Sequence, residues 1–171
     1  MSYPEKRYFG DRGQHDATFR PADTPPEIVG ARTSTSYLAT GASTGGDFGL
    51  YRWDFTSGEP AGPAPHLHKT ISESFFVLSG EVRLFDGERW VDARSGDFLY
   101  VPPGGTHAFR NESGEPASML ILFAPGAPRE NYFETLAAVG KGELSLTDEE
   151  WTEFYLHHDT YWEDTYWERT D

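Results

Sequence analysis

The pattern of apolar and polar positions changes twice along the chain. Residues 1–30 are polar, contain four prolines and show little periodicity, so we expect an extended N-terminal arm. Residues 31–125 form a series of short runs rich in Val, Phe, Tyr, Trp, Leu and Thr, separated by glycine-containing turns. Short strands at this spacing predict a small antiparallel barrel or sandwich. In residues 126–171 the spacing becomes helical, which predicts short helices packed outside the barrel, followed by an acidic, aromatic tail.

Two local signals predict where particular elements begin and end. Asp86-Gly87 lies between the runs EVRLF and ERWVD, and it indicates a two-residue hairpin because both residue types tolerate positive φ. Thr147 is followed three residues later by Glu150, which is the spacing of a capping box. We therefore expect a C-terminal helix to begin directly after Thr147.

Length, charge and composition exclude several classes of function. A chain of 171 residues can bury one sizeable core, and its net charge of −14 disfavours nucleic acid and anionic membranes as partners, since like charges repel. Because there is no cysteine, any metal must be held by histidine, carboxylate or water. The N-terminal residues lack the apolar core of a signal peptide, and no run is long enough to span a membrane. We expect a soluble, cytoplasmic protein.

Two histidines and a glutamate lie close together in the stretch PHLHKTISESFF. Side chains alternate along a strand, so His66 and His68 project from the same face. Glu73 lies five residues after His68, and this odd separation would put it on the opposite face of an uninterrupted strand. The segment KTIS, residues 69–72, must therefore bulge or turn if the three side chains are to meet.

A third histidine follows a turn signal in GDFLYVPPGGTHAFRN. The Pro102–Gly105 turn can return the chain so that His107 enters from a second strand, with Phe109 on the same face. Three neutral imidazoles and one carboxylate make a donor set suited to Mn, Fe, Co, Ni, Cu or Zn. At a six-coordinate ion this set leaves positions open, as catalysis requires.

The complete spacing resembles the two motifs of the cupin superfamily. The first motif is matched by His66-x-His68, four residues, Glu73, six residues and Gly80; the second by Gly96, five residues, Pro102-x-Gly104, two residues, His107, three residues and Asn111. The resemblance implies an all-β, double-stranded β-helix, the small antiparallel jelly-roll barrel of this family. It also implies that His66, His68, Glu73 and His107 bind one divalent transition metal per chain (Fe, Mn, Ni or a similar ion, with Zn as a further candidate), and that the chain forms a homodimer.

The first motif departs from the family pattern at one position. A glycine usually stands six residues before the first histidine, whereas this chain has Pro60 there, between Gly58 and Gly62. That glycine shapes a turn and binds no metal. The departure therefore concerns the local backbone and leaves the ligand set intact.

The resemblance implies several alternative functions for a chain with all four ligand positions filled. The layout is similar to single-domain quercetinase-like dioxygenases, which implies an oxidoreductase that uses dioxygen on a small aromatic or enolic substrate, flavonol-like or diketone-like. Glu73 would then complete the coordination or act as the general base. The first alternative is an isomerase or polyketide cyclase that uses the metal as a Lewis acid. The second is a non-catalytic, ligand-binding cupin whose metal is structural.

The substrate pocket of such a protein is expected to be apolar and aromatic. Phe75 and Val77 follow Glu73 at alternate positions, and Phe109 follows His107 in the same way. Tyr51 and Trp53 share one face of an earlier strand. Ordinary core packing is the alternative for these side chains, and is favoured for Tyr51 and Trp53, because strand patterning does not say which face is inward.

The remaining histidines and the end of the chain fall outside both motifs. His15, His157 and His158 are expected at the surface or at helix ends, the alternative being that a C-terminal histidine closes over the barrel mouth. Residues 159–163 and 164–168 both read DTYWE. We expect a frayed tail or a patch on the barrel wall. A lid or dimer contact is the alternative, because clustered large aromatics are costly to expose.

Overall fold

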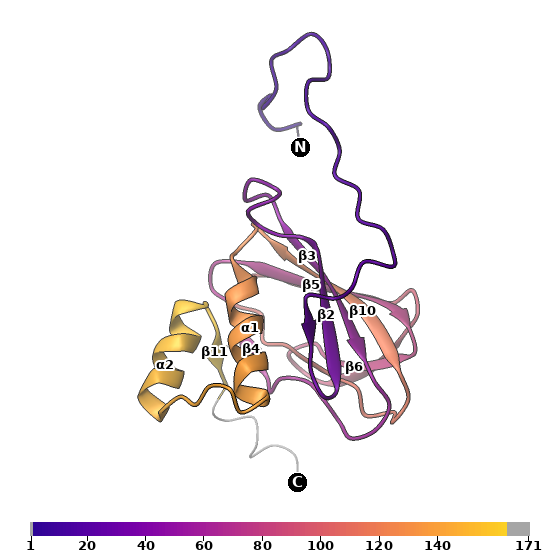
Figure 1. Cartoon of the computed structure of the whole chain (residues 1–171), viewed down its shortest axis with the longest axis vertical. Helices are drawn as coiled ribbons and strands as arrows, with labels where there is room; N and C mark the ends of the chain where they lie inside the picture. The colour runs from indigo at the N-terminus through magenta and orange to yellow at the C-terminus, as the bar shows by residue number, and fades with distance from the viewer. Residues whose placement is uncertain (1, 164–171) are drawn as a thin grey trace.

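The computed structural model describes residues 2–163, which form an antiparallel β-barrel with two helices at one side (Figure 1). The six-stranded sheet has the order β1-β2-β3-β10-β5-β8, and two smaller sheets have the orders β7-β6-β9 and β11-β4. The strands are β1 (Ile28–Val29), β2 (Thr33–Ala39), β3 (Gly49–Phe55), β4 (His66–Leu67), β5 (Ser72–Ser79), β6 (Glu81–Phe85), β7 (Trp90–Arg94), β8 (Phe98–Val101), β9 (Ala108–Arg110), β10 (Ala117–Ala124) and β11 (Tyr161–Trp162). The predicted all-β class is confirmed.

The core is built from the inward positions of three neighbouring strands. Ile121 on β10 lies opposite Tyr51 on β3 and Phe75 on β5, and these three side chains are at most 1% exposed. Val77, two residues along β5, is fully buried, whereas Phe76 between them is 39% exposed. Because alternate residues point to opposite faces, the period-two pattern places one apolar face inside the barrel. Burying that face supplies most of the favourable free energy of folding.

The helices α1 (Arg129–Gly140) and α2 (Asp148–His157) lie next to each other at the side of the barrel (Figure 1). The hydroxyl of Thr147 accepts a hydrogen bond from the Glu150 backbone N–H, and the Glu150 carboxylate accepts one from the Thr147 N–H at 2.8 Å. This is the predicted capping box, so α2 begins where the sequence indicates. Neither α1 nor α2, the helices of the described part of the chain, is long and apolar enough to cross a membrane.

The hairpin between β6 and β7 differs from its prediction. Phe85 pairs with Trp90, so the loop contains four residues instead of two. The Asp86 carboxylate accepts hydrogen bonds from the backbone N–H groups of Glu88 and Arg89, both at 2.9 Å. These bonds favour a longer Asx-type turn, in which only Gly87 adopts positive φ.

The N-terminal arm has no secondary structure of its own. Residues 2–27 contain neither helix nor strand, and the arm extends away from the barrel before β1 begins (Figure 1). The cavity of the candidate site is lined by residues of the barrel and of the two helices.

Candidate metal centre

The four predicted ligands come from three strands that meet inside the barrel. His66 begins β4, His68 directly follows it, Glu73 is the second residue of β5 and His107 directly precedes β9. The chain bends at residues 69–70, between β4 and β5, so the predicted break in strand register is confirmed. That break turns Glu73 back toward the histidines. The backbones of His66 and His107 hydrogen-bond to each other in both directions, at 3.0 and 2.9 Å, which aligns the two motifs.

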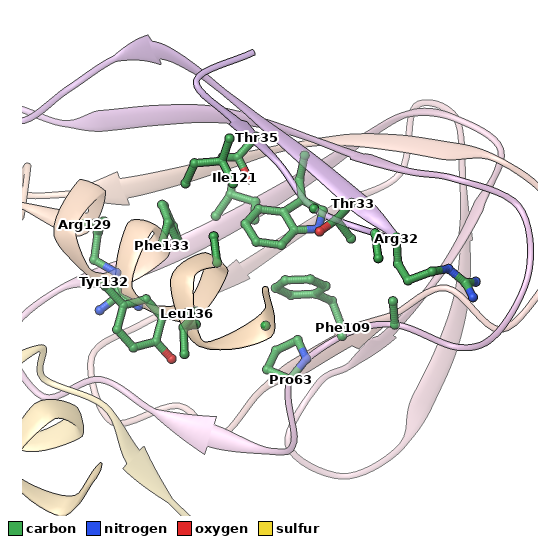
Figure 2. A pocket seen from close by; sticks show the side chains of 18 of the residues that line it. Arg32, Thr33, Thr35, Pro63, Phe109, Ile121, Arg129, Tyr132, Phe133 and Leu136 are labelled. Carbon is green, nitrogen blue, oxygen red and sulfur yellow. The ribbon is translucent and has the colours of Figure 1, made fainter. Parts of the chain in front are cut away.

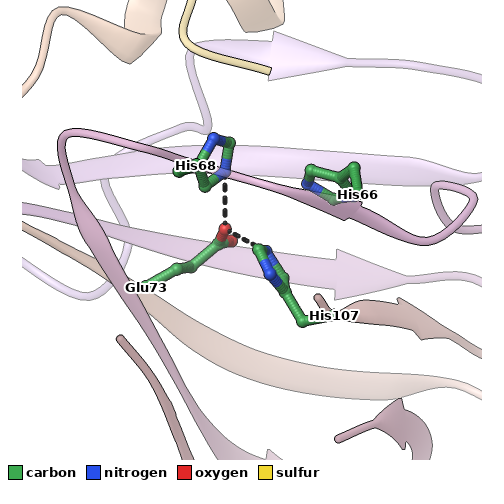
Figure 3. Close-up of side chains that lie close together, drawn as sticks. All are labelled: His66, His68, Glu73 and His107. Atoms are coloured by element: carbon green, nitrogen blue, oxygen red, sulfur yellow. Dashed lines mark hydrogen bonds and ion pairs between the residues drawn. The ribbon is translucent and has the colours of Figure 1, made fainter. Parts of the chain in front are cut away.

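The four side chains converge on one point (Figure 3). Glu73 Oε2 lies 3.0 Å from His68 Nε2 and 2.8 Å from His107 Nε2. One ligand atom from each residue can be chosen so that all four lie within 4.8 Å of one another. His66, His68, Glu73 and His107 are at most 5% exposed, so the protein shields this point from bulk water.

Backbone carbonyls hold the outer nitrogen of every histidine in this cluster. Nδ1 of His66 contacts the carbonyl of Ala64 at 2.9 Å, and Nδ1 of His107 contacts that of Gly105 at 3.0 Å. Nδ1 of His68 contacts the carbonyl of Asp159 at 2.5 Å. A carbonyl only accepts, so each Nδ1 donates its proton and each neutral ring keeps a lone pair on Nε2.

This arrangement is chemically suited to a cation. The lone pairs of His68 Nε2 and His107 Nε2 face a carboxylate oxygen at hydrogen-bonding distance, so a positive centre, either a proton or a metal ion, is needed between them. Outer carbonyls that fix the tautomer of metal-binding histidines are typical of metal sites. The cluster could therefore hold a divalent ion through three nitrogens and one oxygen, although the donor set does not select one metal.

Burial and neighbouring charges shift the pKa values of His66, Glu73 and His107. Burial, and then repulsion from a protonated His107, lower the pKa of His66 to about 3, whereas the Glu73 carboxylate outweighs burial and raises the pKa of His107. Burial alone would raise the pKa of Glu73, but His107 and His68 outweigh it and hold the pKa of that carboxyl well below its usual range. His66 is therefore neutral and Glu73 is ionised, as ligands must be.

A cavity of about 710 Å³ opens beside the cluster, with His66 and Glu73 in its wall. The rest of the lining is mostly apolar and comes mainly from β1, β2, β3, β10 and α1, with Phe109 of β9, Tyr155 of α2 and Trp162 of β11. Figure 2 shows Phe109, Phe133 and Ile121 among the side chains around it. A buried polar centre beside a large apolar cavity is the usual form of a small-molecule site.

The predicted pocket residues separate into two groups. Trp53 and Phe109 line the cavity. Phe75, Val77 and Tyr51 are not among its lining residues; they are fully buried in the core, where the Tyr51 hydroxyl donates to Glu130 at 2.5 Å. Alternation places a side chain inside the barrel, but does not say whether it faces the core or the cavity.

The C-terminal segment lies against the ligand strand, a position closer to the lid given as the alternative for the DTYWE repeat than to the frayed tail that was expected. β11 pairs with β4, with Tyr161 opposite Leu67 and Trp162 opposite His66, and the Trp162 ring lies 5.2 Å from the His66 ring. The first DTYWE copy thus lies against the ligand strand, while the second copy lies outside the described residues.

The other histidines take separate positions. His157 is exposed at the end of α2, and His158, which directly follows that helix as expected for a helix-end histidine, is buried. His15, in the arm, is exposed. None of the three is part of the cluster.

One helix face contributes residues that the sequence analysis left unassigned. Arg129, Tyr132, Phe133 and Leu136 on α1 all line the cavity. Their i, i+3, i+4, i+7 spacing is a readable sign of one helix face. Nothing in that spacing says which surface the face covers.

The departure at Pro60 is accommodated by a neighbouring glycine. A Cβ on Gly62 would lie 1.9 Å from the backbone carbonyl oxygen of Phe109, so the chain passes too close there for any side chain. The turn before the ligands therefore depends on Gly62, two residues from the usual position.

The sequence is similar to known proteins over part of its length. Residues 51–123 match the family model of the Cupin domain. Quercetin 2,3-dioxygenase of Bacillus subtilis (strain 168) is 36% identical over 79 residues, which are 46% of this chain and 23% of that protein. A protein of Aquifex aeolicus (strain VF5), described as uncharacterized, is 36% identical over 62 residues, 36% of this chain and 50% of its own length. The chain thus spans half or less of the length of these relatives.

Solved structures share the fold at low identity. KdgF from Halomonas sp. is 17% identical, with a TM-score of 0.55 over 65% of this chain and 96% of that chain. The polyketide cyclase RemF from Streptomyces resistomycificus is 20% identical, with a TM-score of 0.55 over 67% of this chain and 82% of that one. At this identity the similarity concerns the fold alone, the double-stranded β-helix predicted from the two motifs.

Proposed function

We propose, from the premise that residues 51–123 form a cupin domain, that this chain is a metal-dependent dioxygenase acting on a small aromatic or enolic substrate. The observation that carries the proposal is the buried three-histidine, one-glutamate cluster in the wall of a large apolar cavity. The partial similarity to quercetin 2,3-dioxygenase supports the choice of reaction. The homodimer and the cytoplasmic location stay predictions.

The cluster would bind the metal, and the cavity would bind the substrate. His66, His68, His107 and Glu73 would hold the metal, which when bound would supply a Lewis acid and, for a redox-active ion, a path for electrons between substrate and dioxygen. The apolar lining would orient the aromatic body of the substrate and exclude water from it.

Glu73 is suited to move a proton. Its carboxylate lies in the cavity wall and is ionised at neutral pH, because His107 and His68 lower its pKa. A carboxylate of low pKa is a weak base, so it would accept the proton of an enol or phenol whose own pKa a cation in the cluster had lowered. The negative charge left on the substrate oxygen would lie beside the cluster, where a bound cation would stabilise it.

Oxygen consumption tests this function. We expect protein purified without added metal to contain about one transition metal ion per chain, and an oxygen electrode to record uptake with a flavonol, a 1,3-diketone or a catechol. Glu73→Gln keeps the shape of the side chain but removes its charge, so uptake should fall by about 100-fold or more. Glu81→Gln, on the barrel surface, is the matched control and should stay active.

Two outcomes would contradict the proposal. Absence of uptake after reconstitution with Fe, Mn, Ni, Co and Cu would exclude the dioxygenase. Turnover of an enolic substrate under anaerobic conditions would instead favour the isomerase or cyclase, for which the metal acts only as a Lewis acid.

A further inference from the structure

Arg129, the first residue of α1, places a guanidinium group in the cavity wall. The residue is 3% exposed, and its Nη1 donates a hydrogen bond to the carbonyl of His158 at 2.7 Å. The guanidinium carbon lies 4.1 Å from the centre of the Tyr132 ring and 5.1 Å from that of Phe123. Figure 2 shows Arg129 beside Tyr132 and Phe133, at one side of the cavity.

This buried charge has no carboxylate partner within residues 2–163. No Asp or Glu oxygen of that range lies within 4.0 Å of its nitrogens, and its buried Nε has no hydrogen-bond partner there. Burying a charge is costly unless it is paired, and guanidinium groups bind planar carboxylates through two parallel hydrogen bonds. Arg129 is thus prepared for a negative partner that the described chain does not provide.

The cavity also reverses the charge balance of the protein. The chain has a net charge of −14, yet the charged side chains lining the cavity are Arg32, Arg129 and Lys141 against the single carboxylate of Glu73. That carboxylate belongs to the metal centre. The Arg32 guanidinium donates to the Glu59 carbonyl and Lys141 is exposed, so Arg129 is the buried cation of this wall, and its field in low-dielectric surroundings favours an anion.

We propose that the cavity takes a carboxylic acid with an aromatic or apolar body, and that Arg129 determines this specificity by pairing with the carboxylate. The body would contact Trp53, Phe109 and Phe133, and its other end would reach the wall that contains His66 and Glu73. This inference rests on the proposed function and names its substrate class: an acid whose reacting group is separate from its carboxylate.

A purely structural role for Arg129 makes a different prediction. In that case the side chain only joins α1 to the end of α2 through the His158 carbonyl. Its loss would weaken the fold, and would affect neutral and anionic ligands equally. A matched pair of probes that differ only in charge separates the two roles.

The test uses 1-naphthoate and 1-naphthamide, titrated by calorimetry into the full-length chain as purified and after chelator treatment. We expect the wild type to bind naphthoate about tenfold more tightly than naphthamide in both preparations. Arg129→Met should reduce that ratio to about one. Arg129→Lys should leave an intermediate ratio, because lysine keeps the positive charge but lacks the two parallel N–H donors of the guanidinium group. Arg94→Met, an exposed arginine on β7, is the matched control and should keep the wild-type ratio.

A measurement on the wild type keeps the test decisive if the variants do not fold. Naphthoate, but not naphthamide, should shift the Nε–H resonance of Arg129 in a ¹⁵N NMR spectrum. Equal affinities for the two probes in the wild type would overturn the proposal. An unchanged ratio in Arg129→Met, or a preference that disappears with the metal, would also overturn it. This test measures binding and not oxygen uptake. The proposal of a dioxygenase and the proposal of a preference for acids can therefore be contradicted independently.

Discussion

The three histidines of the candidate metal centre are supported by two different regions of the molecule. His66 and His107 are each held by a carbonyl two residues earlier, so the loop that precedes each histidine fixes its ring. His68 is held by the carbonyl of Asp159, 91 positions later in the chain. Two ligands are thus positioned locally, and the third depends on the C-terminal segment.

The C-terminal segment is fastened at the turn that follows His68. The Asp159 carboxylate accepts hydrogen bonds from the Lys69 N–H at 3.0 Å and from the Thr70 N–H at 2.8 Å, and from the Thr70 hydroxyl at 2.7 Å. The same residue therefore holds the His68 ring through its backbone and the 69–70 bend through its side chain. This contrast implies that the centre can lose one ligand's support without losing the barrel.

Removal of the remotely supported ligand should have the largest effect. His68→Ala deletes one of three nitrogens, so we expect the metal dissociation constant to rise by more than about 100-fold and the metal content to fall toward zero. His157→Ala, an exposed histidine on α2, is the matched control. Elemental analysis of both proteins measures the effect, and a His68→Ala protein with full metal content would show that the site assignment is wrong.

Loosening the remote support should have a smaller effect on the same quantity. Asp159→Ala removes the acceptor for the 69–70 bend, and alanine tolerates the φ of 51° at this position poorly, so metal affinity should fall by about 10- to 100-fold. Asp159→Asn keeps an acceptor oxygen and tolerates that φ, and should lose less. Competition with a chromogenic chelator measures both. Unchanged affinity in the alanine variant would mean that His68 needs no remote support.

Acid should weaken the C-terminal region through His158. Burial, and then the charge of Arg129, lower the pKa of His158 from its usual 6.5 to about 4. Between these values the unfolded chain binds a proton that the folded chain does not, so the free energy of unfolding falls as the pH decreases through this window.

Urea unfolding of the chelator-treated protein at about pH 7.5 and about pH 4.5 measures this acid sensitivity. His158→Gln cannot titrate and retains an amide for the contact with Asn131, so its loss of stability over this range should be smaller than that of the wild type. An equal loss of stability in both proteins would show that the titration of His158 does not cause the acid sensitivity.

The helix cap should have the smallest effect and should leave the centre intact. Thr147→Ala removes the hydroxyl that accepts from Glu150, and we expect the free energy of unfolding to fall by about 1 kcal/mol. Thr147→Ser restores the acceptor and should recover most of that loss. Metal affinity should stay unchanged in both, because Thr147 lies at the opposite end of α2 from Asp159. A weaker metal affinity in Thr147→Ala would show that the whole helix supports His68.

The sequence by itself determined the features that depend on near neighbours. Strand alternation, the fixed motif offsets and the odd spacing to Glu73 predicted the barrel, the four clustered side chains and the bend between β4 and β5. The alternation and the bend depend on backbone periodicity and turn chemistry, which a few adjacent residues set, whereas the approach of His107 to Glu73, 34 positions away, was implied by the resemblance to the two motifs. Where a nearby side chain competed, as Asp86 does in its loop, even a local prediction of loop length was wrong.

The tertiary structure alone decided which distant residues complete the site. The helical spacing of Arg129, Tyr132 and Phe133 indicates one face, but only the packing of α1 against the barrel makes that face a wall of the cavity. The contact between Asp159 and His68 likewise exists only because α2 returns the chain to β4. Such contacts depend on how whole elements bury their apolar faces together, and no local pattern encodes that choice.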